Sequence, residues 1–372
     1  METVKQTRVR IFSRGWEGLV LAVGFFPLAV IIWNPTWITK NWEFRFWSDL
    51  IFLNVVHNAF SFYIIWKSNE IRRAIRERYD GQPWRLHLKA ASVFTLSSLI
   101  LVLLYQNEVS NPLFYFIILT LLSFLPLQHA MSQQIGLSRL YDHALKQQIA
   151  LTEKQSARLS LMAKIERIGH RIALLGVLLQ ASAWLEASPQ KLPTWWLPAS
   201  NWAGDWGHRI FLVGTTLLLA SYILRPYWWK SNQWVFNLRR AWEIFPAYFS
   251  LNYIALQRLN HGLEYLAVTA TIDKASQRRK SRAFEWTVFL LLSSTVAYLY
   301  LHVIAARWNP SPFSGLNLGS LSLLFASVSA AISITHYYYD SQIFRFSQPE
   351  FRDNVLPLLS PAKPTERRIS GS

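Results

Sequence analysis

Apolar residues are gathered into long runs along this chain, and charged residues are concentrated between them. The runs lie near residues 16–35, 47–66, 90–105, 112–131, 169–186, 209–229, 284–304 and 318–339. A helix of about 20 apolar residues crosses a hydrocarbon core of about 30 Å, and most of the runs approach that length. The pattern predicts an all-α fold: a polytopic integral membrane protein with about eight transmembrane helices.

Two stretches between the runs predict helices of another kind. Residues 139–168 are rich in Gln, Lys, Glu and Leu, which indicates a helical hairpin that extends two membrane helices into the cytoplasm. Residues 234–271 are apolar and aromatic but carry charges, which indicates an interfacial helical segment at the cytoplasmic face. We expect residues 1–346 to form one membrane domain and residues 347–372, with Pro and scattered charge, to form a flexible cytoplasmic tail.

The basic residues orient the predicted helices. When the runs alternate between two sides, most of the 38 Lys and Arg residues fall on the side of the two termini. The other side holds only Lys40, Arg45, Lys191, Arg209 and Arg307. Because Lys and Arg accumulate in cytoplasmic loops, both termini are predicted to be cytoplasmic.

Composition narrows the class of protein further. Only 16% of the residues are charged and 52% are apolar, against roughly 25% charged in soluble domains, so a soluble enzyme is excluded. The absence of cysteine excludes disulfides and thiolate metal sites. The net charge of +17 lies in loops between apolar runs, so we expect membrane lipids as partners and no nucleic acid.

Four of the nine histidines fall at the same predicted membrane face: His57, His129, His261 and His336. Ionisable groups at this depth are costly and indicate function by default. Glu264 follows His261 by three residues and Asp340 follows His336 by four, so each pair shares one helix face. Mixed imidazole and carboxylate ligation suits non-haem iron. The sequence therefore predicts a metal site with these four histidines as ligands and with Glu264 and Asp340 as catalytic carboxylates.

Structural explanations exist for the same residues. His57 lies beside Asn54 and Asn58 and is compatible with hydrogen bonding between helices. His336 and Asp340 enclose three tyrosines typical of an aromatic belt. Other polar groups on the predicted hairpin are less favoured as ligands because solvated helix faces often carry them: Asp142, His143, Glu166 and His170. The remaining histidines, His87, His208 and His302, are excluded from this centre by their positions.

The segment from His336 to Arg345, HYYYDSQIFR, resembles an HYxxDxxIWR-like ending in uncharacterised bacterial polytopic membrane proteins with scattered histidine motifs. Phe344 stands where Trp is expected. The segments NHGLEY at 260–265 and His57-Asn58 resemble further motifs of that group. The resemblance implies a location in the bacterial inner membrane. Histidine-rich membrane di-iron hydroxylases and desaturases are a chemical analogy, although this chain lacks their HxxxH motifs.

These features favour a metal-dependent oxidoreductase, most simply an iron enzyme, that acts on a lipid or isoprenoid substrate at the cytoplasmic face. An electron donor or a partner subunit would complete such an activity. Two alternatives stay open at this point. The same polar residues suit a non-enzymatic membrane subunit or transporter, and a single histidine as general base would suffice for a lipid-modifying acyltransferase.

Overall fold

The part of the chain that the structure describes consists of helices and their connections, and it contains no strand. This computed structural model describes residues 55–107, 112–149, 151–184, 196–226, 254–276 and 319–359, with a few single positions between 11 and 33. The helices are α4 (Val55–Lys67), α5 (Asn69–Arg78), α6 (Trp84–Asn107), α7 (Pro112–Gln148), α8 (Glu153–Trp184), α9 (Trp196–Ile223), α11 (Ile254–Ser276), α13 (Gly319–Ile343), α14 (Pro349–Asn354) and α15 (Leu356–Leu359). The predicted all-α class is confirmed.

The long helices correspond to the predicted apolar runs. Among the residues that the structure describes, one helical stretch, Trp84–Leu104 of α6, is long and apolar enough to cross a membrane alone. The run at 284–304 and most of the run at 16–35 lie outside the described residues. Eight membrane spans therefore stay a prediction.

Helices α7 and α8 form the expected helical hairpin, because each continues from a predicted membrane run into the segment 139–168. The turn between them ends in a capping box. The backbone N–H of Gln155 donates to Thr152 Oγ1 over 3.3 Å, and the backbone N–H of Thr152 donates to Gln155 Oε1 over 3.0 Å. This exchange satisfies two backbone donors that would otherwise lack partners and fixes where α8 begins.

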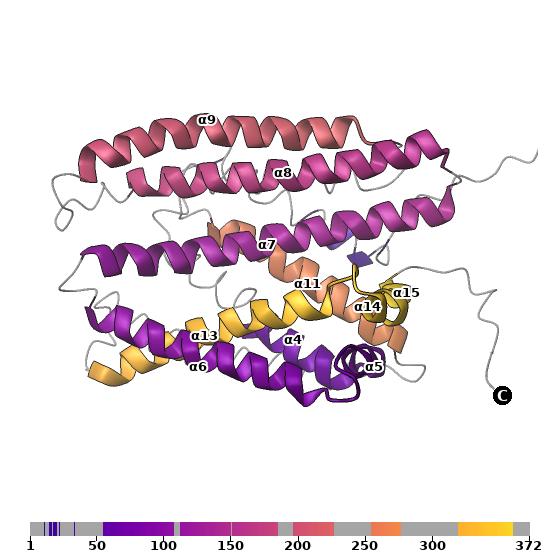
Figure 1. The fold of residues 1–372 in the computed structure, drawn as a ribbon, viewed down its shortest axis with the longest axis horizontal. Helices are drawn as coiled ribbons and strands as arrows, with labels where there is room; N and C mark the ends of the chain where they lie inside the picture. Colours follow the sequence, from indigo (N-terminus) through magenta and orange to yellow (C-terminus); the bar gives the residue numbers. More distant parts are fainter. Residues whose placement is uncertain are drawn as a thin grey trace, which may run out of the picture.

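Glycines bring α8 and α9 into close contact along one edge of the bundle (Figure 1). A Cβ added to Gly176 of α8 would lie 2.5 Å from the backbone nitrogen of Phe211, and one added to Gly207 of α9 would lie 2.8 Å from that of Gln180. Gly214 would place its Cβ against the backbone of Ala173. Small residues that let two backbones approach are a common basis of helix packing in membranes.

The rest of the bundle surrounds α11. Its side chains Tyr265, Ala267 and Ile272 are fully buried, and it contacts α4, α7 and α15. The sequence predicts that this segment is helical and lies at the cytoplasmic membrane face. The structure confirms the helix and encloses α11 among neighbouring helices, because the apolar residues between its charged positions pack against them. Its position relative to the membrane stays a prediction. Residues 234–253 of the predicted interfacial segment lie outside the described residues.

Two short helices lie where the sequence predicted the first part of a flexible tail. Helices α14 and α15 cover residues 349–359, and their side chains Phe351, Val355 and Leu359 are buried in the same core cluster as Ile71 of α5. Pro349 occupies the first helical position, where its fixed φ favours helix initiation. Apolar residues at helical spacing therefore outweigh the Pro and charge content up to residue 359, and residues 360–372 lie outside the described part.

A single methyl group tests the close α8 and α9 contact. Gly214→Ala should lower the thermal unfolding midpoint of the purified protein, because overpacking costs about 1–3 kcal/mol. Gly136→Ala in α7 is the matched control, since a Cβ there meets nothing within 4 Å. Alanine is favoured over glycine in a helix by about 1 kcal/mol, so the control should unfold at the same or a higher temperature. Equal midpoints for both variants would contradict the packing described here.

Candidate metal centre

The four histidines predicted from the sequence lie together in the structure. Each comes from a different helix: His57 from α4, His129 from α7, His261 from α11 and His336 from α13. The ring centroid of His57 lies 4.5 Å from that of His261 and 4.2 Å from that of His336. The His129 ring lies 5.0 Å and 5.2 Å from the same two rings. All four side chains are buried.

The Nε2 atoms of His57, His261 and His336 lie close together. His57 Nε2 lies 3.1 Å from His261 Nε2 and 2.6 Å from His336 Nε2. A neutral ring nitrogen either donates one proton or accepts through one lone pair. His57 Nε2 can therefore form a full hydrogen bond with only one of its two neighbours, His261 Nε2 or His336 Nε2.

Asp340 connects this group to two hydroxyls. Its Oδ1 accepts hydrogen bonds from Ser61 Oγ over 2.7 Å and from the Tyr265 hydroxyl over 3.0 Å. Ser61 and Tyr265 also contact each other through their hydroxyls. Oδ2 lies 3.3 Å from His336 Nε2 and 3.4 Å from His129 Nε2. The two hydroxyls thus fix the carboxylate so that its second oxygen faces the imidazoles.

This arrangement fits a metal ion. His57, His129, His336 and Asp340 each offer one donor atom, and these atoms lie within 4.8 Å of one another. A metal–nitrogen distance of about 2.0–2.1 Å places two ligands at a right angle about 2.9 Å apart. Neighbouring donor atoms here are separated by 2.6 to 3.4 Å, which brackets that value. The group could hold a metal ion.

Two residues predicted for the site, His261 and Glu264, lie outside this group of four. His261 Nε2 lies 3.1 Å from His57 Nε2, but His261 is not part of the group whose donor atoms all lie within 4.8 Å of one another. Glu264 is fully buried one turn further along α11, and it also lies outside that set. The catalytic role predicted for Glu264 stays a prediction.

The sequence interpretation missed Ser61 and the stacking role of Tyr337. Ser61 follows His57 by four residues, as Tyr265 follows His261, so both lie one turn beyond a candidate ligand. A search at this spacing would have found Ser61. The Tyr337 ring stacks on His129 with centroids 4.2 Å apart and planes inclined by 23°. This stacking restricts the orientation of the imidazole.

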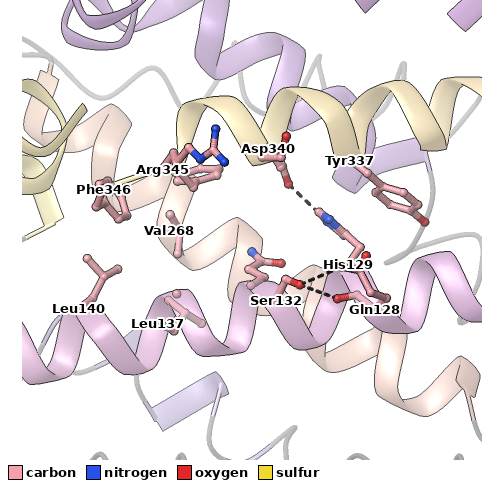
Figure 2. A pocket seen from close by; sticks show the side chains of 14 residues that line it. Gln128, His129, Ser132, Leu137, Leu140, Val268, Tyr337, Asp340, Arg345 and Phe346 are labelled. Atoms are coloured by element: carbon pink, nitrogen blue, oxygen red, sulfur yellow. Dashed lines mark hydrogen bonds and ion pairs between the residues drawn. The ribbon is translucent and has the colours of Figure 1, made fainter. Parts of the chain in front are cut away.

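A pocket of about 240 Å³ leads to this centre between α7 and α13. Figure 2 shows His129 on α7 and Asp340 on α13 facing each other across it. Leu137 and Leu140 line the pocket further along α7, and Phe346 lines it beyond the end of α13. A small apolar group in this pocket would therefore contact the centre at His129 and Asp340.

The other polar groups considered from the sequence lie outside the centre. Asp142 and Glu166 belong to a buried ion network around Arg225, whose side chain is fully enclosed. Arg225 donates to Asp142 Oδ2 over 3.2 Å, to Glu166 Oε2 over 2.9 Å and to Ser138 Oγ over 3.1 Å. This network joins α7 and α8 to the end of α9.

The remaining described histidines also have separate surroundings. His170 is buried in α8, and His143 is partly buried in α7, where burial and then the charge of Lys146 lower its pKa. His87 Nδ1 lies 2.9 Å from the Tyr339 hydroxyl, and His208 is exposed on α9. His302 lies outside the described residues.

Comparison of the chain with protein-family models, with curated proteins and with solved structures finds no match. The function of the protein is therefore inferred from its site.

The ion network around Arg225 should contribute strongly to stability. Arg225→Met removes the enclosed cation shared by Asp142 and Glu166 and leaves these carboxylates only the partly exposed Arg139. The loss of one partner from a buried pair costs up to about 3–5 kcal/mol. Arg209→Met is the control, because Arg209 is exposed on α9 and exposed charges contribute about 0–1 kcal/mol. Thermal unfolding in detergent should separate the two variants clearly. Similar midpoints would contradict a structural role for the network.

Proposed function

We propose that this protein is a multi-pass membrane metalloenzyme of the non-haem iron type that oxidises a lipid or isoprenoid-like substrate. One observation carries the proposal: three imidazoles and one carboxylate converge from three helices that are far apart in the sequence. All four side chains are buried, where such groups are costly unless paired or bound to a metal.

The chemistry of the donor set favours iron. Carboxylate combined with neutral imidazole is the ligand set of non-haem iron oxygenases, whereas copper(I) and structural zinc sites often use sulfur. The chain has no cysteine, so thiolate ligands are absent. We assign the ligand role to His57, His129, His336 and Asp340, and we place His261 beside them as a further imidazole.

The hydroxyls of Ser61 and Tyr265 hold Asp340 in position. Hydrogen bonds to a ligating carboxylate orient it and typically change metal affinity 10–100-fold when removed. Glu264, buried one turn from His261, is our candidate for holding a proton near the centre. Glu264 is buried but does not belong to the group of converging donor atoms, which favours a role in proton transfer over metal ligation.

The reaction class that suits this centre is hydroxylation with dioxygen as the oxidant. A C–H bond of the substrate becomes C–O–H, and the second oxygen atom leaves as water. Dioxygen takes two electrons from the C–H bond and two electrons with two protons from an external reductant. The iron would supply dioxygen activation, while the protein holds the substrate carbon in the pocket and excludes bulk water.

The surface of the bundle supports a location in the membrane. Apolar side chains on α6 point outward, including Leu96, Leu99 and Leu103, which are each about 60% exposed. Trp66 and Trp84 lie exposed where α4 ends and α6 begins, and Trp202 lies exposed in the first turns of α9. Exposed indoles near helix ends are typical of membrane boundaries. Together with the distribution of Lys and Arg, they favour both termini on the cytoplasmic side of a bacterial inner membrane.

Metal analysis tests the proposal directly. The detergent-purified protein should contain iron in stoichiometric amount by mass spectrometry, and His336→Ala should lose it, because one of the converging ligands is gone. His208→Ala is the matched control, since this histidine is exposed on α9 and should leave the iron content unchanged.

Two results would overturn the proposal. If the folded wild-type protein neither contains metal nor takes up Fe(II), the proposed metal centre does not exist. If the protein holds only zinc, the metal centre exists but the proposed redox function is refuted, because zinc is not redox-active.

The positioning role of Tyr265 has its own test. Tyr265→Phe removes one hydrogen bond to Asp340 and should weaken Fe(II) affinity about 10–100-fold, measured by competition with a chelator. Tyr338→Phe is the control, because Tyr338 packs against the apolar core rather than against Asp340. Equal affinity in both variants would show that Asp340 does not depend on Tyr265.

A further inference from the structure

We infer that the pocket between α7 and α13 binds an anionic amphiphile, with its acid group at Arg345 and its apolar chain directed toward His129 and Asp340. The inference rests on the proposed function in one respect: the bound amphiphile is the substrate of the oxidation. The binding itself does not require that function to be correct.

The walls of the pocket suit a hydrocarbon chain. Leu137 and Leu140 of α7, Val268 of α11 and Phe344 and Phe346 beyond α13 line it. Polar groups gather at the end where His129 and Asp340 meet (Figure 2). Ligand sites are commonly apolar with a small number of placed polar groups. The apolar walls therefore bind the chain, and the polar end marks the reacting position.

Arg345 supplies the charge that selects an acid. It is exposed, lines the pocket and forms no ion pair with any residue in the part of the chain that the structure describes. Asp340 is the only acidic side chain in the lining, and it faces the imidazoles. A guanidinium binds carboxylate or phosphate through two parallel hydrogen bonds. Arg345 is therefore placed to hold either group at the rim.

Asp340 lies in the last turn of α13, and Arg345 lies two residues beyond its last residue, Ile343. Both line the pocket, so the acid group is held just past the end of the helix that carries Asp340. The pocket has a volume of about 240 Å³ and is open on one side. A short chain segment fills this space, and any longer chain would leave through the open side of the pocket.

Gly136 keeps the pocket open on the α7 side. It lines the pocket, and a Cβ added there meets nothing within 4 Å. A larger side chain at this position would therefore enter the pocket instead of clashing with a neighbouring helix. This allows the pocket to be filled without disturbing the packing of the bundle.

The binding test uses the full chain in lipid nanodiscs. Displacement of a dansyl-labelled fatty acid would be measured with decanoate, decyl phosphate and the neutral decanol. Decanoate and decyl phosphate should bind at least 10-fold more tightly than decanol. Gly136→Leu should weaken decanoate binding at least 10-fold, whereas Gly136→Ala should retain it.

Arg345→Gln separates recognition of charge from recognition of the chain. It should remove the preference for decanoate over decanol and leave decanol affinity unchanged, and Arg345→Lys should restore part of the preference. Comparison of decanoate with decyl phosphate shows whether a carboxylate or a phosphate is the better head group.

Several outcomes would overturn the inference. If the Gly136→Leu variant binds decanoate as tightly as the wild type, the acid binds elsewhere. If decanol binds more tightly than decanoate, the pocket does not select an anionic ligand. Decanoate binding that survives Arg345→Gln but requires iron would place the acid on the metal instead. Metal content of every variant is measured in parallel. An iron-containing protein with unselective binding refutes only this inference, whereas selective binding without metal refutes only the proposed function.

Discussion

The interaction on which the candidate site depends is the contact of the buried Asp340 carboxylate with two hydroxyls and two imidazoles. Ser61 lies on α4, Tyr265 on α11, His129 on α7 and Asp340 with His336 on α13, so one side chain joins four helices. A buried charge is costly unless other groups compensate it. The hydroxyls satisfy one oxygen, and the second oxygen faces nitrogen atoms that a cation can share. The fold is stable around this group because each of the four helices provides a partner.

The two halves of the bundle are held together in different ways. Helices α8 and α9 approach through glycines and carry no part of the centre, and the Arg225 network fixes them to α7 by charge. The half that contains the centre packs through larger apolar side chains around α11. Helix α7 belongs to both halves, since it provides His129 to the centre and Asp142 to the ion network. The pocket beside His129 belongs to the half that contains the centre, because no residue of α8 or α9 lines it.

Part of the surface and of the interior of the described bundle shows an inversion of the order usual in soluble proteins, although most of its buried side chains are apolar. Leucines are exposed on α6, whereas histidines, carboxylates and an arginine are enclosed. In a hydrocarbon solvent, exposed apolar side chains cost nothing, and polar groups gain from meeting inside the bundle. The same inversion gives a lipophilic molecule a route toward a polar centre, as the pocket between α7 and α13 provides.

The sequence by itself determined the helical class, the helical hairpin of α7 and α8, and the four histidines that the structure brings together. Helical class follows from apolar runs, and the shared depth of the histidines follows from counting residues along those runs. The sequence alone did not determine the enclosure of α11, the packing of α14 and α15, or the partners of Asp340. Those depend on how helices are rotated and which neighbours they meet. Ser61 and Asp340 are separated by most of the chain, and periodicity along one helix carries no information about the face of another, so only the tertiary structure could bring them together.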